Sequence, residues 1–391
     1  MAFPMSVVIL QCSNFIYFLT SLISLMVMAA TADKTLQSVL WSLGKNGNVD
    51  EMSTKPPKDT KISPTLLPKL TKEPAVKAND SSRKTELALV SMDFNHGTDY
   101  VHNNDPILLA PYNYLIGHPG KSIRSKMIQA FNHWLQVPAK SLAIITRVVE
   151  MLHNASLLVD DIEDDSTLRR GAPVAHHIYG MAQTINCANY AYFLALQELQ
   201  KLNSVQMMTI FSEEILNLHR GQGIELFWRD SITCPTEEEF IDMINSKTGG
   251  LLRLAVRLMM AASNVEMDYT RLVNLIGIHF QIRDDYMNLQ SKHYTDSKGF
   301  CEDLSEGKFS FPVIHSIRAN PNDRQLLEIL KQKPQSVELK QYALKLMEAT
   351  NTFDYTKQYL RDLFIDIQQE VCKFGNNPVL DKILVQLDVQ D

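Results

Sequence analysis

The spacing of apolar positions along the chain predicts a protein built almost entirely of helices. From Ile144 through Val148 and Leu152 to Val159, apolar side chains recur every three or four residues and form one wide helical face. Comparable patterns fill the stretches Ala188–Leu202, Val205–His219, Glu237–Asn245, Leu251–Ala262, Tyr269–Gln290 and Leu326–Leu330. No stretch alternates between apolar and polar residues for more than a few positions, so an all-α bundle is predicted.

The helical patterns begin near Asp105 and are separated by residues that break helices. The breakers are Pro119-Gly120, Gly171-Ala172-Pro173, Cys234-Pro235, Gly299 and Asn320-Pro321. The length of this region fits a single domain over residues 105–391. Residues 33–104 instead mix prolines with Lys, Ser and Thr. We expect a disordered linker there, because such a composition buries too little apolar surface to compensate the entropy lost on ordering.

The N-terminal region has a different character. Residues 1–32 carry no charged side chain, and residues 15–32 are almost entirely apolar, close to the about 20 residues of a membrane-spanning helix. Lysines follow this run from Lys34 onward and none precedes it, so an anchor here would leave the rest of the chain in the cytosol. Three interpretations stay open: a membrane anchor, for example in the endoplasmic reticulum; a signal peptide cleaved at Ala30-Thr31-Ala32; and a dispensable stretch ahead of a start at Met28.

Composition and charge exclude several classes of protein. Acidic residues outnumber basic ones by 44 to 38, which argues against a nucleic-acid partner because such binders carry a basic stripe. Hydrophobic residues make up 45% of the chain, so a wholly disordered protein is excluded. The five cysteines form no CxxC pair, so neither a zinc site nor a disulfide framework is indicated.

Two acidic clusters give the first indication of chemistry. Asp160 and Asp164 are four residues apart near the end of a long apolar helix, so they share one face. Carboxylates in this position repel each other, and the negative end of the helix dipole adds to the penalty. A hard cation such as Mg²⁺, which prefers oxygen ligands, would reverse both effects. A second cluster, Asp284 with Asp285, lies in another long helix close after Gln281.

Basic residues near these clusters favour a site for phosphate groups. Two acidic patches that faced each other across a cavity would hold a diphosphate through Mg²⁺, whereas the alternative is two unrelated patches on the surface. Guanidinium and ammonium groups suit phosphate oxygens, and a helix N-terminus adds free N–H groups. Each basic residue alone is typical of a solvated surface, but the set is large: Lys121, Arg124, His153, Arg169, Arg170, Lys247, Lys298 and Lys308.

Five stretches of the chain, in order, resemble the eukaryotic geranylgeranyl diphosphate synthases, which are trans-isoprenyl diphosphate synthases. They are residues 107–135, 151–180 (with VDDIEDD), 247–251 (KTGGL), 280–289 (FQIRDDYMNL) and 301–317 (with EGKFSFP). The similarity is nearly continuous from Ile107 to about Gly375. Among these enzymes the chain looks most like fungal copies, some of which supply diterpene pathways, including those to indole-diterpenes.

The resemblance implies a fold, a reaction and a cofactor. The fold would be an isoprenoid-synthase-type helical bundle around a deep central cavity, assembled as a homodimer or a higher homo-oligomer. The reaction would join isopentenyl diphosphate to dimethylallyl, geranyl or farnesyl diphosphate by ionisation, condensation and elimination, and would yield geranylgeranyl diphosphate. The cofactor would be a cluster of several Mg²⁺ ions, which stabilise the departing pyrophosphate.

The resemblance also implies roles for individual residues. The metal ligands would be Asp160, Asp161, Asp164, Asp284 and Asp285, which together with Lys247 form the catalytic set. The isopentenyl diphosphate site would contain Lys121, Arg124, His153 and Arg170. The allylic diphosphate site would contain Arg169, Lys247, Thr248, Gln281, Lys298 and Lys308.

Two positions depart from the family pattern. Asn288 ends the second acidic motif where many relatives have Asp; animal and fungal geranylgeranyl synthases share this change, so we expect activity to be retained. Glu225 replaces an expected Asp, so no role is assigned to that position from the resemblance.

Product length follows from the size of residues beneath the first acidic motif. A growing prenyl chain would run down the cavity below Asp160, past Ala155 and Ser156 one helical turn earlier. Both side chains are small, so the route stays open and a geranylgeranyl product is predicted, whereas bulky aromatic residues would favour a farnesyl product. The depth limit is expected on another helix, near Tyr190, Tyr192 and Phe193.

Other functions fit these residues less well. A class I terpene cyclase shares the fold and the first acidic motif, but the second site reads DDYMNLQSK and lacks the usual Ser and final Glu. A non-catalytic subunit that redirects a partner synthase would be expected to lose metal ligands, which this chain keeps. A plain helical scaffold would require every one of these charges to be a solvated surface group.

Overall fold

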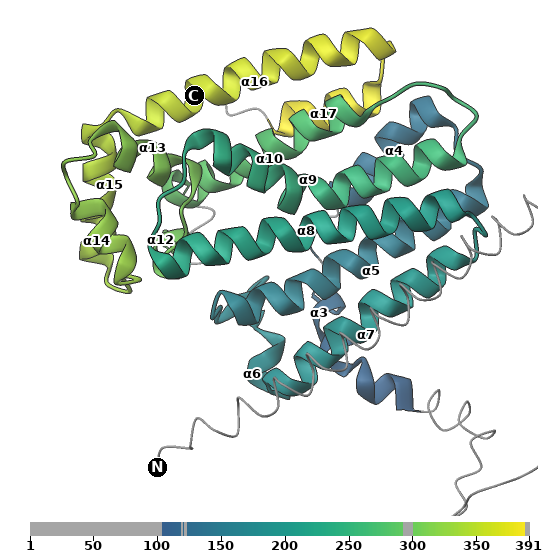
Figure 1. Ribbon diagram of the computed structural model, residues 1–391, viewed down its shortest axis with the longest axis horizontal. Helices are drawn as coiled ribbons and strands as arrows, with labels where there is room; N and C mark the ends of the chain where they lie inside the picture. Colours follow the sequence, from purple (N-terminus) through teal and green to yellow (C-terminus); the bar gives the residue numbers. More distant parts are fainter. Residues whose placement is uncertain (1–103, 119, 121–122, 292–299, 388–391) are drawn as a thin grey trace, which may run out of the picture. The chain divides into compact units, whose positions relative to one another are not determined.

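Long helices dominate the structure, a computed structural model that describes residues 104–118, 120, 123–291 and 300–387 (Figure 1). The first half contains α3 (Ala110–Ile116), α4 (Ile123–Leu135), α5 (Ala139–Glu163), α6 (Ala175–Tyr179), α7 (Met181–Gln200), α8 (Val205–Ser231) and α9 (Glu237–Ala262). The second half contains α10 (Thr270–Gln290), α12 (Glu302–Glu306), α13 (Phe311–Ala319), α14 (Gln325–Lys331), α15 (Val337–Ala349), α16 (Thr352–Phe374) and α17 (Pro378–Leu387). In these ranges the only sheet pairs β1 (Leu168–Arg169) with β2 (Ala172–Pro173), so the predicted all-α fold is confirmed.

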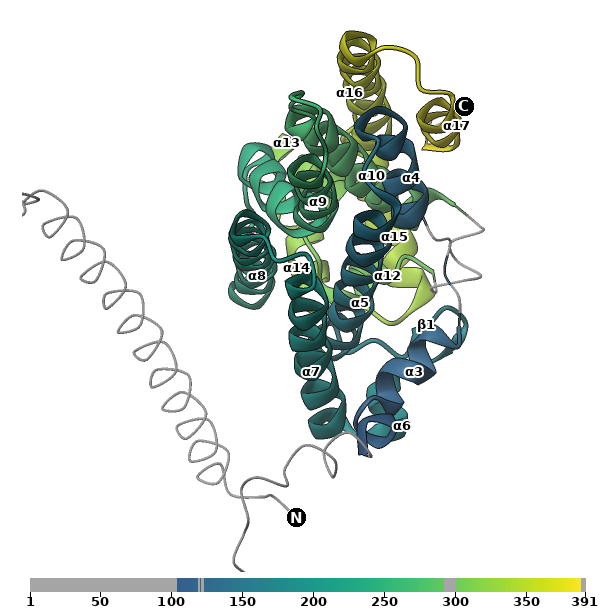
Figure 2. The same cartoon turned by 90° about the vertical axis from the view of Figure 1, so that its right-hand side faces the viewer.

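Helix α9 is the central helix of the bundle, because it packs against α4, α5, α8, α10 and α13 (Figure 2). A capping box begins it: the Thr236 hydroxyl accepts a hydrogen bond from the Glu239 N–H, and the Glu239 carboxylate accepts one from the Thr236 N–H. Its buried face includes Phe240, Ile244 and Leu254. Side chains in the middle of α9 therefore meet those of several other helices.

The Lys-Thr-Gly-Gly segment does not interrupt α9, although the sequence predicts separate helices over residues 237–245 and 251–262. The glycines serve close packing instead. A Cβ atom on Gly277 of α10 would lie 3.0 Å from the Cα atom of Gly249, so the backbones of α9 and α10 touch at this point. The pair lets the two helices approach more closely than larger side chains would allow.

Helix α5 is the one helix in the described part of the chain that is long and apolar enough to cross a membrane by length and composition. Its apolar face, however, lies in the core: Ile145 and Leu152 are at most 1% exposed. The helical face predicted from the sequence is thus confirmed as a packing surface. The predicted anchor, residues 1–32, and linker, residues 33–104, lie outside the described residues except for Asn104.

A β-hairpin follows α5 and was not predicted from the sequence. Its two turn residues, Arg170 and Gly171, have φ angles of +56° and +79°, as a two-residue type I′ turn requires. Arg169 pairs with Ala172 across the hairpin. The turn sends the two adjacent arginines to different partners: Arg169 bonds Asp161 on α5, whereas Arg170 reaches the segment after α3.

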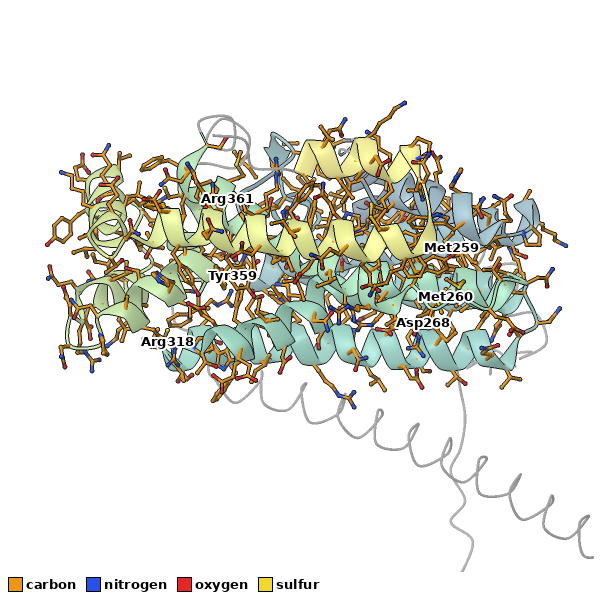
Figure 3. The ribbon with its side chains drawn as sticks, turned by 90° about the horizontal axis from the view of Figure 1, so that it is seen from above. Met259, Met260, Asp268, Arg318, Tyr359 and Arg361 are labelled. Carbon is orange, nitrogen blue, oxygen red and sulfur yellow. The ribbon has the colours of Figure 1, made fainter. Side chains whose placement is uncertain are left out.

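The C-terminal helices cover two sides of the bundle. Helix α17 packs against α4, where the fully buried Asn377 donates a hydrogen bond to the Ala130 carbonyl at 2.9 Å. Helix α16 packs against α10 and α13. Tyr359 of α16 contacts the ring of Phe311 with centroids 4.8 Å apart, and Arg361 lies exposed on the same helix (Figure 3).

Candidate active site

The first acidic segment closes helix α5. Asp160 lies in the last turn, and Asp164 is the C-cap residue, whose N–H donates to the Asp160 carbonyl at 2.9 Å. Both side chains line one cavity of about 310 Å³. Asp161 does not line it; it is 1% exposed, and its Oδ1 accepts a hydrogen bond from Arg169 Nε at 2.7 Å. Of the first acidic segment, Asp160 and Asp164, which are one helical turn apart, therefore line the cavity, whereas Asp161 does not.

The second acidic segment lies on α10, and part of it faces the same cavity. Asp284 and Asn288 line the cavity one helical turn apart. Asp285 is fully buried and accepts hydrogen bonds from Gln281 Nε2 at 2.9 Å, Lys308 Nζ at 3.0 Å and the first backbone N–H of α13 at 3.1 Å. Asp285 thus fastens α10 to the chain that follows α12.

One cavity joins the two acidic segments. Its walls come from α4, α5, α8, α9, α10 and α12 and from the hairpin after α5. The lining side chains are Arg124, Leu157, Asp160, Asp164, Ser166, Leu168, Arg169, Glu225, Arg229, Lys247, Thr248, Phe280, Gln281, Asp284, Asn288, Glu302, Asp303, Glu306 and Lys308.

Helix α9 contributes Lys247 and Thr248 to the cavity. Lys247 Nζ donates to Glu225 Oε2 on α8 and lies 3.7 Å from Asp160 Oδ1 on α5. Thr248 Oγ1 donates to Gln281 Oε1 on α10 at 2.6 Å. Two adjacent residues therefore connect α9 to all three of its long neighbours at the level of the cavity.

Negative charge accumulates in the cavity. Burial, reinforced by Asp160, raises the pKa of Asp164 to about 7. Burial also raises the pKa of Glu306 well above its usual value, and Asp164 and Asp303 add to the effect. Burial alone would lower the pKa of Lys247, but its acidic neighbours outweigh it and raise that pKa. A group of carboxylates in this state is stabilised by added positive charge.

A basic cluster lies beside the acidic segments. Arg124 of α4 lines the cavity, and its Nη1 lies 2.9 Å from His153 Nε2 on α5. A guanidinium has only donors, so Nε2 accepts and the ring proton is on Nδ1. Burial, followed by Arg124, Arg170 and Arg169, lowers the pKa of His153 to about 2. Burial and Arg170 lower the pKa of Arg124 to about 10. Such mutual repulsion between cations favours a bound anion.

The predicted basic residues are only partly described. Arg170 Nη1 donates to the His118 carbonyl at 2.5 Å. A Cβ on Gly120 would lie 3.1 Å from the Arg170 guanidinium, so the chain before α4 passes close to this side chain. Lys121 and Lys298 lie outside the described residues.

Ala155 and Ser156, which were predicted to set product length, are not among the residues that line the cavity. Ala155 is fully buried, and the Ser156 hydroxyl donates to the His153 carbonyl at 2.8 Å. The cavity is lined at this level by their neighbour Leu157. Of the three aromatic residues considered for the depth limit, Phe193 is 65% exposed and Tyr190 bonds Asp105.

Tyr192 is the aromatic residue that lies near the first acidic segment. Burial, followed by Glu163 and Asp160, raises the pKa of its phenol. Its ring also contacts that of His219 on α8, with centroids 5.7 Å apart. Tyr192 is therefore the one of the three that the geometry associates with a route below Asp160.

Several lining residues were not found from the sequence. Arg229 donates to Asp164 Oδ1 at 2.7 Å, and Glu302 and Glu306 line the cavity from α12. Glu225 was noted only as a departure from a pattern, yet it bonds Lys247. A signal existed: Arg229 follows Glu225 by one helical turn, and Glu302 and Glu306 have the same spacing as Asp160 and Asp164.

Comparison with known proteins identifies relatives over most of this chain. The sequence model of the polyprenyl synthetase family matches residues 105–347. The geranylgeranyl pyrophosphate synthase of Mucor circinelloides f. lusitanicus is 59% identical over 296 residues, which cover 76% of this chain and 98% of that protein. The same-named enzyme of Fusarium fujikuroi is 57% identical over 305 residues, 76% of this chain and 73% of that protein.

A longer relative matches over part of its length. The copalyl diphosphate synthase of Talaromyces verruculosus is 53% identical over 312 residues, which cover 77% of this chain and 32% of that protein. The family match contains every residue that lines the cavity. With the helical bundle and the two acidic segments around one cavity, these matches show that the chain belongs to the polyprenyl synthetase family.

Proposed function

We propose that this protein is a geranylgeranyl diphosphate synthase, which condenses isopentenyl diphosphate with dimethylallyl, geranyl and farnesyl diphosphates. The observation that carries the proposal is the single cavity between Asp160 and Asp164 on α5 and Asp284 on α10. Relatives with this name are 59% and 57% identical to the chain. The relation to a copalyl diphosphate synthase supports a role in supplying diterpene biosynthesis.

The chemistry of the cavity fits Mg²⁺, on which the polyprenyl synthetase family generally depends. Asp160, Asp164 and Asp284 supply carboxylate oxygens, the ligands that Mg²⁺ prefers. The raised pKa of Asp164 reflects negative charge that a cation would stabilise. In the side-chain positions of the described residues, no three His, Cys, Asp or Glu groups converge on one point.

Asp161 and Asp285 fit a different role from the metal ligation that the resemblance implied. Asp161 is engaged by Arg169, and Asp285 by Lys308 and Gln281, and both carboxylates are buried away from the cavity. We therefore assign metal binding to the three carboxylates that line the cavity and structural support to these two. Asp161 and Asp285 would hold the basic groups that meet the diphosphate.

The basic residues stabilise the leaving group in the first step, when the carbon–oxygen bond of the allylic diphosphate breaks. Bound Mg²⁺ supplies positive charge to the departing pyrophosphate. Lys247, Lys308 and Arg169 line the same cavity and would donate hydrogen bonds to the pyrophosphate oxygens, with Lys298 as a predicted addition. Thr248 extends the set from α9.

The second step requires isopentenyl diphosphate to be held beside the allylic cation. Arg124, His153 and Arg170, with Lys121 as a predicted fourth member, would bind its diphosphate, since the three described groups gather beside the cavity. The isopentenyl double bond attacks the cation, and a proton then leaves to a pyrophosphate oxygen. Leu157, Leu168 and Phe280 are the apolar residues that line the cavity, and they would limit the access of water, which otherwise captures the cation.

We propose residues 105–391 as the catalytic domain and a homodimer as its assembly. Apolar side chains on the outer faces of α7 and α8 offer an interface: Met181, Ile185, Phe193, Leu216 and Phe227 are all at least 43% exposed.

We further propose that residues 1–32 anchor this cytosolic domain to a membrane such as the endoplasmic reticulum, through the linker 33–104. Membrane fractionation of the full chain and of one that starts at Met28 tests this, and equal solubility would contradict it.

The decisive experiment for the activity is product analysis with labelled isopentenyl diphosphate and each allylic diphosphate, with and without Mg²⁺. We expect a C20 diphosphate that forms only with the metal. Asp160→Asn and Asp284→Asn should each lower kcat by about 100-fold or more, because each removes a carboxylate that would hold the Mg²⁺ whose positive charge stabilises the leaving group. Asp242→Asn changes an exposed acid on α9 and serves as the control. Full activity of the two cavity variants would contradict the proposal.

A further inference from the structure

The end of helix α5 is held by Arg229, a side chain of α8 that also lines the cavity. Arg229 Nη1 donates to Asp164 Oδ1 at 2.7 Å, and its Nη2 donates to the Glu163 carbonyl at 2.8 Å. Arg229 is only 9% exposed, so both bonds form in a largely dehydrated environment. One guanidinium therefore contacts a side chain and the backbone of the first acidic segment at the same time.

This contact answers two separate electrostatic needs of the segment. The last carbonyls of a helix have no partner within the helix, and the C-terminal end carries partial negative charge. Asp164 places its carboxyl group at the same end, next to Asp160. The planar fork of an arginine presents donors on two separate nitrogens, so Nη1 meets the carboxylate while Nη2 meets the carbonyl, a fixed geometry that a lysine ammonium lacks.

The base from which Arg229 extends is also fixed. Its neighbour Trp228 is 8% exposed and belongs to the hydrophobic cluster formed with α9, α10 and α13. Helix α8 ends with Ile232 in the left-handed conformation, and the Thr233 N–H bonds back to the Trp228 carbonyl at 2.9 Å. The arginine is thus held both at its backbone and at its guanidinium.

Arg229 bonds a backbone carbonyl of α5 as well as a carboxylate, and this distinguishes it from Arg169 and Lys247. Arg169 pairs with Asp160 and Asp161, and Lys247 pairs with Glu225 and Asp160. A diphosphate offers oxygens of the same kind as these carboxylates and can replace them as partners. The Glu163 carbonyl is part of the helix backbone, so Arg229 keeps this anchor when substrate binds.

We propose that Arg229 is a positioning residue, which holds the Asp164 carboxylate toward the cavity so that Asp164 and Asp160 receive Mg²⁺ and diphosphate together. This inference rests on the proposed function, because Arg229 would act through Asp164, one of the residues proposed to bind the metal. It predicts that loss of the guanidinium weakens metal and pyrophosphate binding through Asp164 and leaves the isopentenyl site unaffected.

The test compares Arg229→Gln, Arg229→Lys and Asp164→Asn, the double variant of Arg229→Gln with Asp164→Asn, and the control Arg220→Gln. Arg220 is exposed on the same helix and bonds Asn217. One readout is the Mg²⁺ concentration for half-maximal activity, together with KM for isopentenyl diphosphate. A second readout is calorimetric binding of inorganic pyrophosphate in the presence of Mg²⁺, which needs no turnover.

We expect both Arg229 variants to raise the half-saturating Mg²⁺ concentration and the pyrophosphate Kd about tenfold, as loss of a residue that orients a metal ligand does. KM for isopentenyl diphosphate should change by less than about twofold. In the Asp164→Asn background, Arg229→Gln should add less than about twofold, since it acts through Asp164. Arg220→Gln should match the wild type.

Two outcomes would overturn the inference. One is a lower melting temperature of Arg229→Gln with an unchanged Mg²⁺ requirement and pyrophosphate Kd, which would make the contact purely structural. The other is an undiminished tenfold effect of Arg229→Gln in the Asp164→Asn background. If Arg229→Gln does not fold, Arg229→Lys and its combination with Asp164→Asn decide the question. If the wild type forms no prenyl product yet Arg229→Gln weakens pyrophosphate binding, the proposed function fails and the positioning role stands.

Discussion

Helices α8 and α9 pack tightly at Gly221, one turn before Glu225, and this contact provides a test of how the cavity is built. A Cβ atom on Gly221 would lie 2.6 Å from the Lys247 backbone nitrogen and 2.9 Å from the Met243 carbonyl oxygen. Gly223, two residues later on the same helix, has no atom within 4 Å of such a Cβ. The change Gly→Ala at the two positions therefore differs in packing alone.

The magnitude follows from these distances. Either substitution gains about 0.5–1 kcal/mol from the higher helix propensity of alanine. At position 221 the new methyl group must also move from 2.6 Å to an ordinary contact of 3.4 Å, so α8 shifts by about 0.8 Å from α9. Overpacking of this kind costs about 1–3 kcal/mol. Gly221→Ala should therefore be less stable than Gly223→Ala by about 1–3 kcal/mol.

The same shift should lower activity, because it separates Glu225 on α8 from Lys247 on α9. A misplacement near 1 Å can reduce the rate by about 100-fold, so we expect kcat/KM to fall by about 10- to 100-fold in Gly221→Ala. Gly223→Ala should keep the wild-type rate. Urea denaturation measures the stabilities, and geranylgeranyl diphosphate formation measures the activity. Equal stability and equal activity of the two variants would refute this account of the helix contact.

Three further predictions address other parts of the site. The pKa of His153 lies near 2 in the folded protein and near 6.5 when unfolded, so the unfolded chain binds the extra proton and stability falls as the pH drops below 6.5. His153→Asn should remove about 2 kcal/mol of the loss between pH 6.5 and 5, measured by urea denaturation at both pH values; an unchanged pH dependence would contradict this. Asp285→Ala removes the nearer of the two carboxylates that pair with the partly buried Lys308 and should lower the free energy of unfolding by about 3 kcal/mol, whereas a thermal midpoint equal to that of the wild type would argue against a structural role. Ala155→Phe combined with Ser156→Phe should shorten the product from geranylgeranyl to farnesyl diphosphate, seen by chromatography after dephosphorylation, and an unchanged product would remove the tunnel below Asp160 from the account.

The helical fold was predictable because its signal is local and repeated. The apolar spacing of residues 144–159 matches the buried face of α5, and the predicted helix over Tyr269–Gln290 matches α10. The prediction of separate helices in place of α9 was wrong, because a glycine can either end a helix or let two helices pack closely. Gly249 lies between two stretches that were predicted as separate helices, but it is inside α9 against Gly277, and nothing within α9 itself reveals that partner.

The site was predictable only as a set of residue types. The spacing of Asp160 and Asp164 follows from helix geometry, and both line the cavity with Asp284. The sequence alone did not show which of Asp160 and Asp161, or of Asp284 and Asp285, faces the cavity. Adjacent side chains point in different directions from a helix, and the sequence does not show which direction the cavity lies in. That direction matters only once the neighbouring helices are in place.

What the sequence determined by itself was the class of fold, the pair of acidic motifs and the family to which they belong. Each of these depends on spacing within one segment, where the period of a helix is enough to decide which side chains share a face. The tertiary structure alone decided which carboxylates face the cavity, that Lys247 donates to Glu225, and that Arg229 bonds Asp164 at the end of α5. These are contacts between helices distant in the chain, and they depend on how closely the backbones approach, which no single segment encodes.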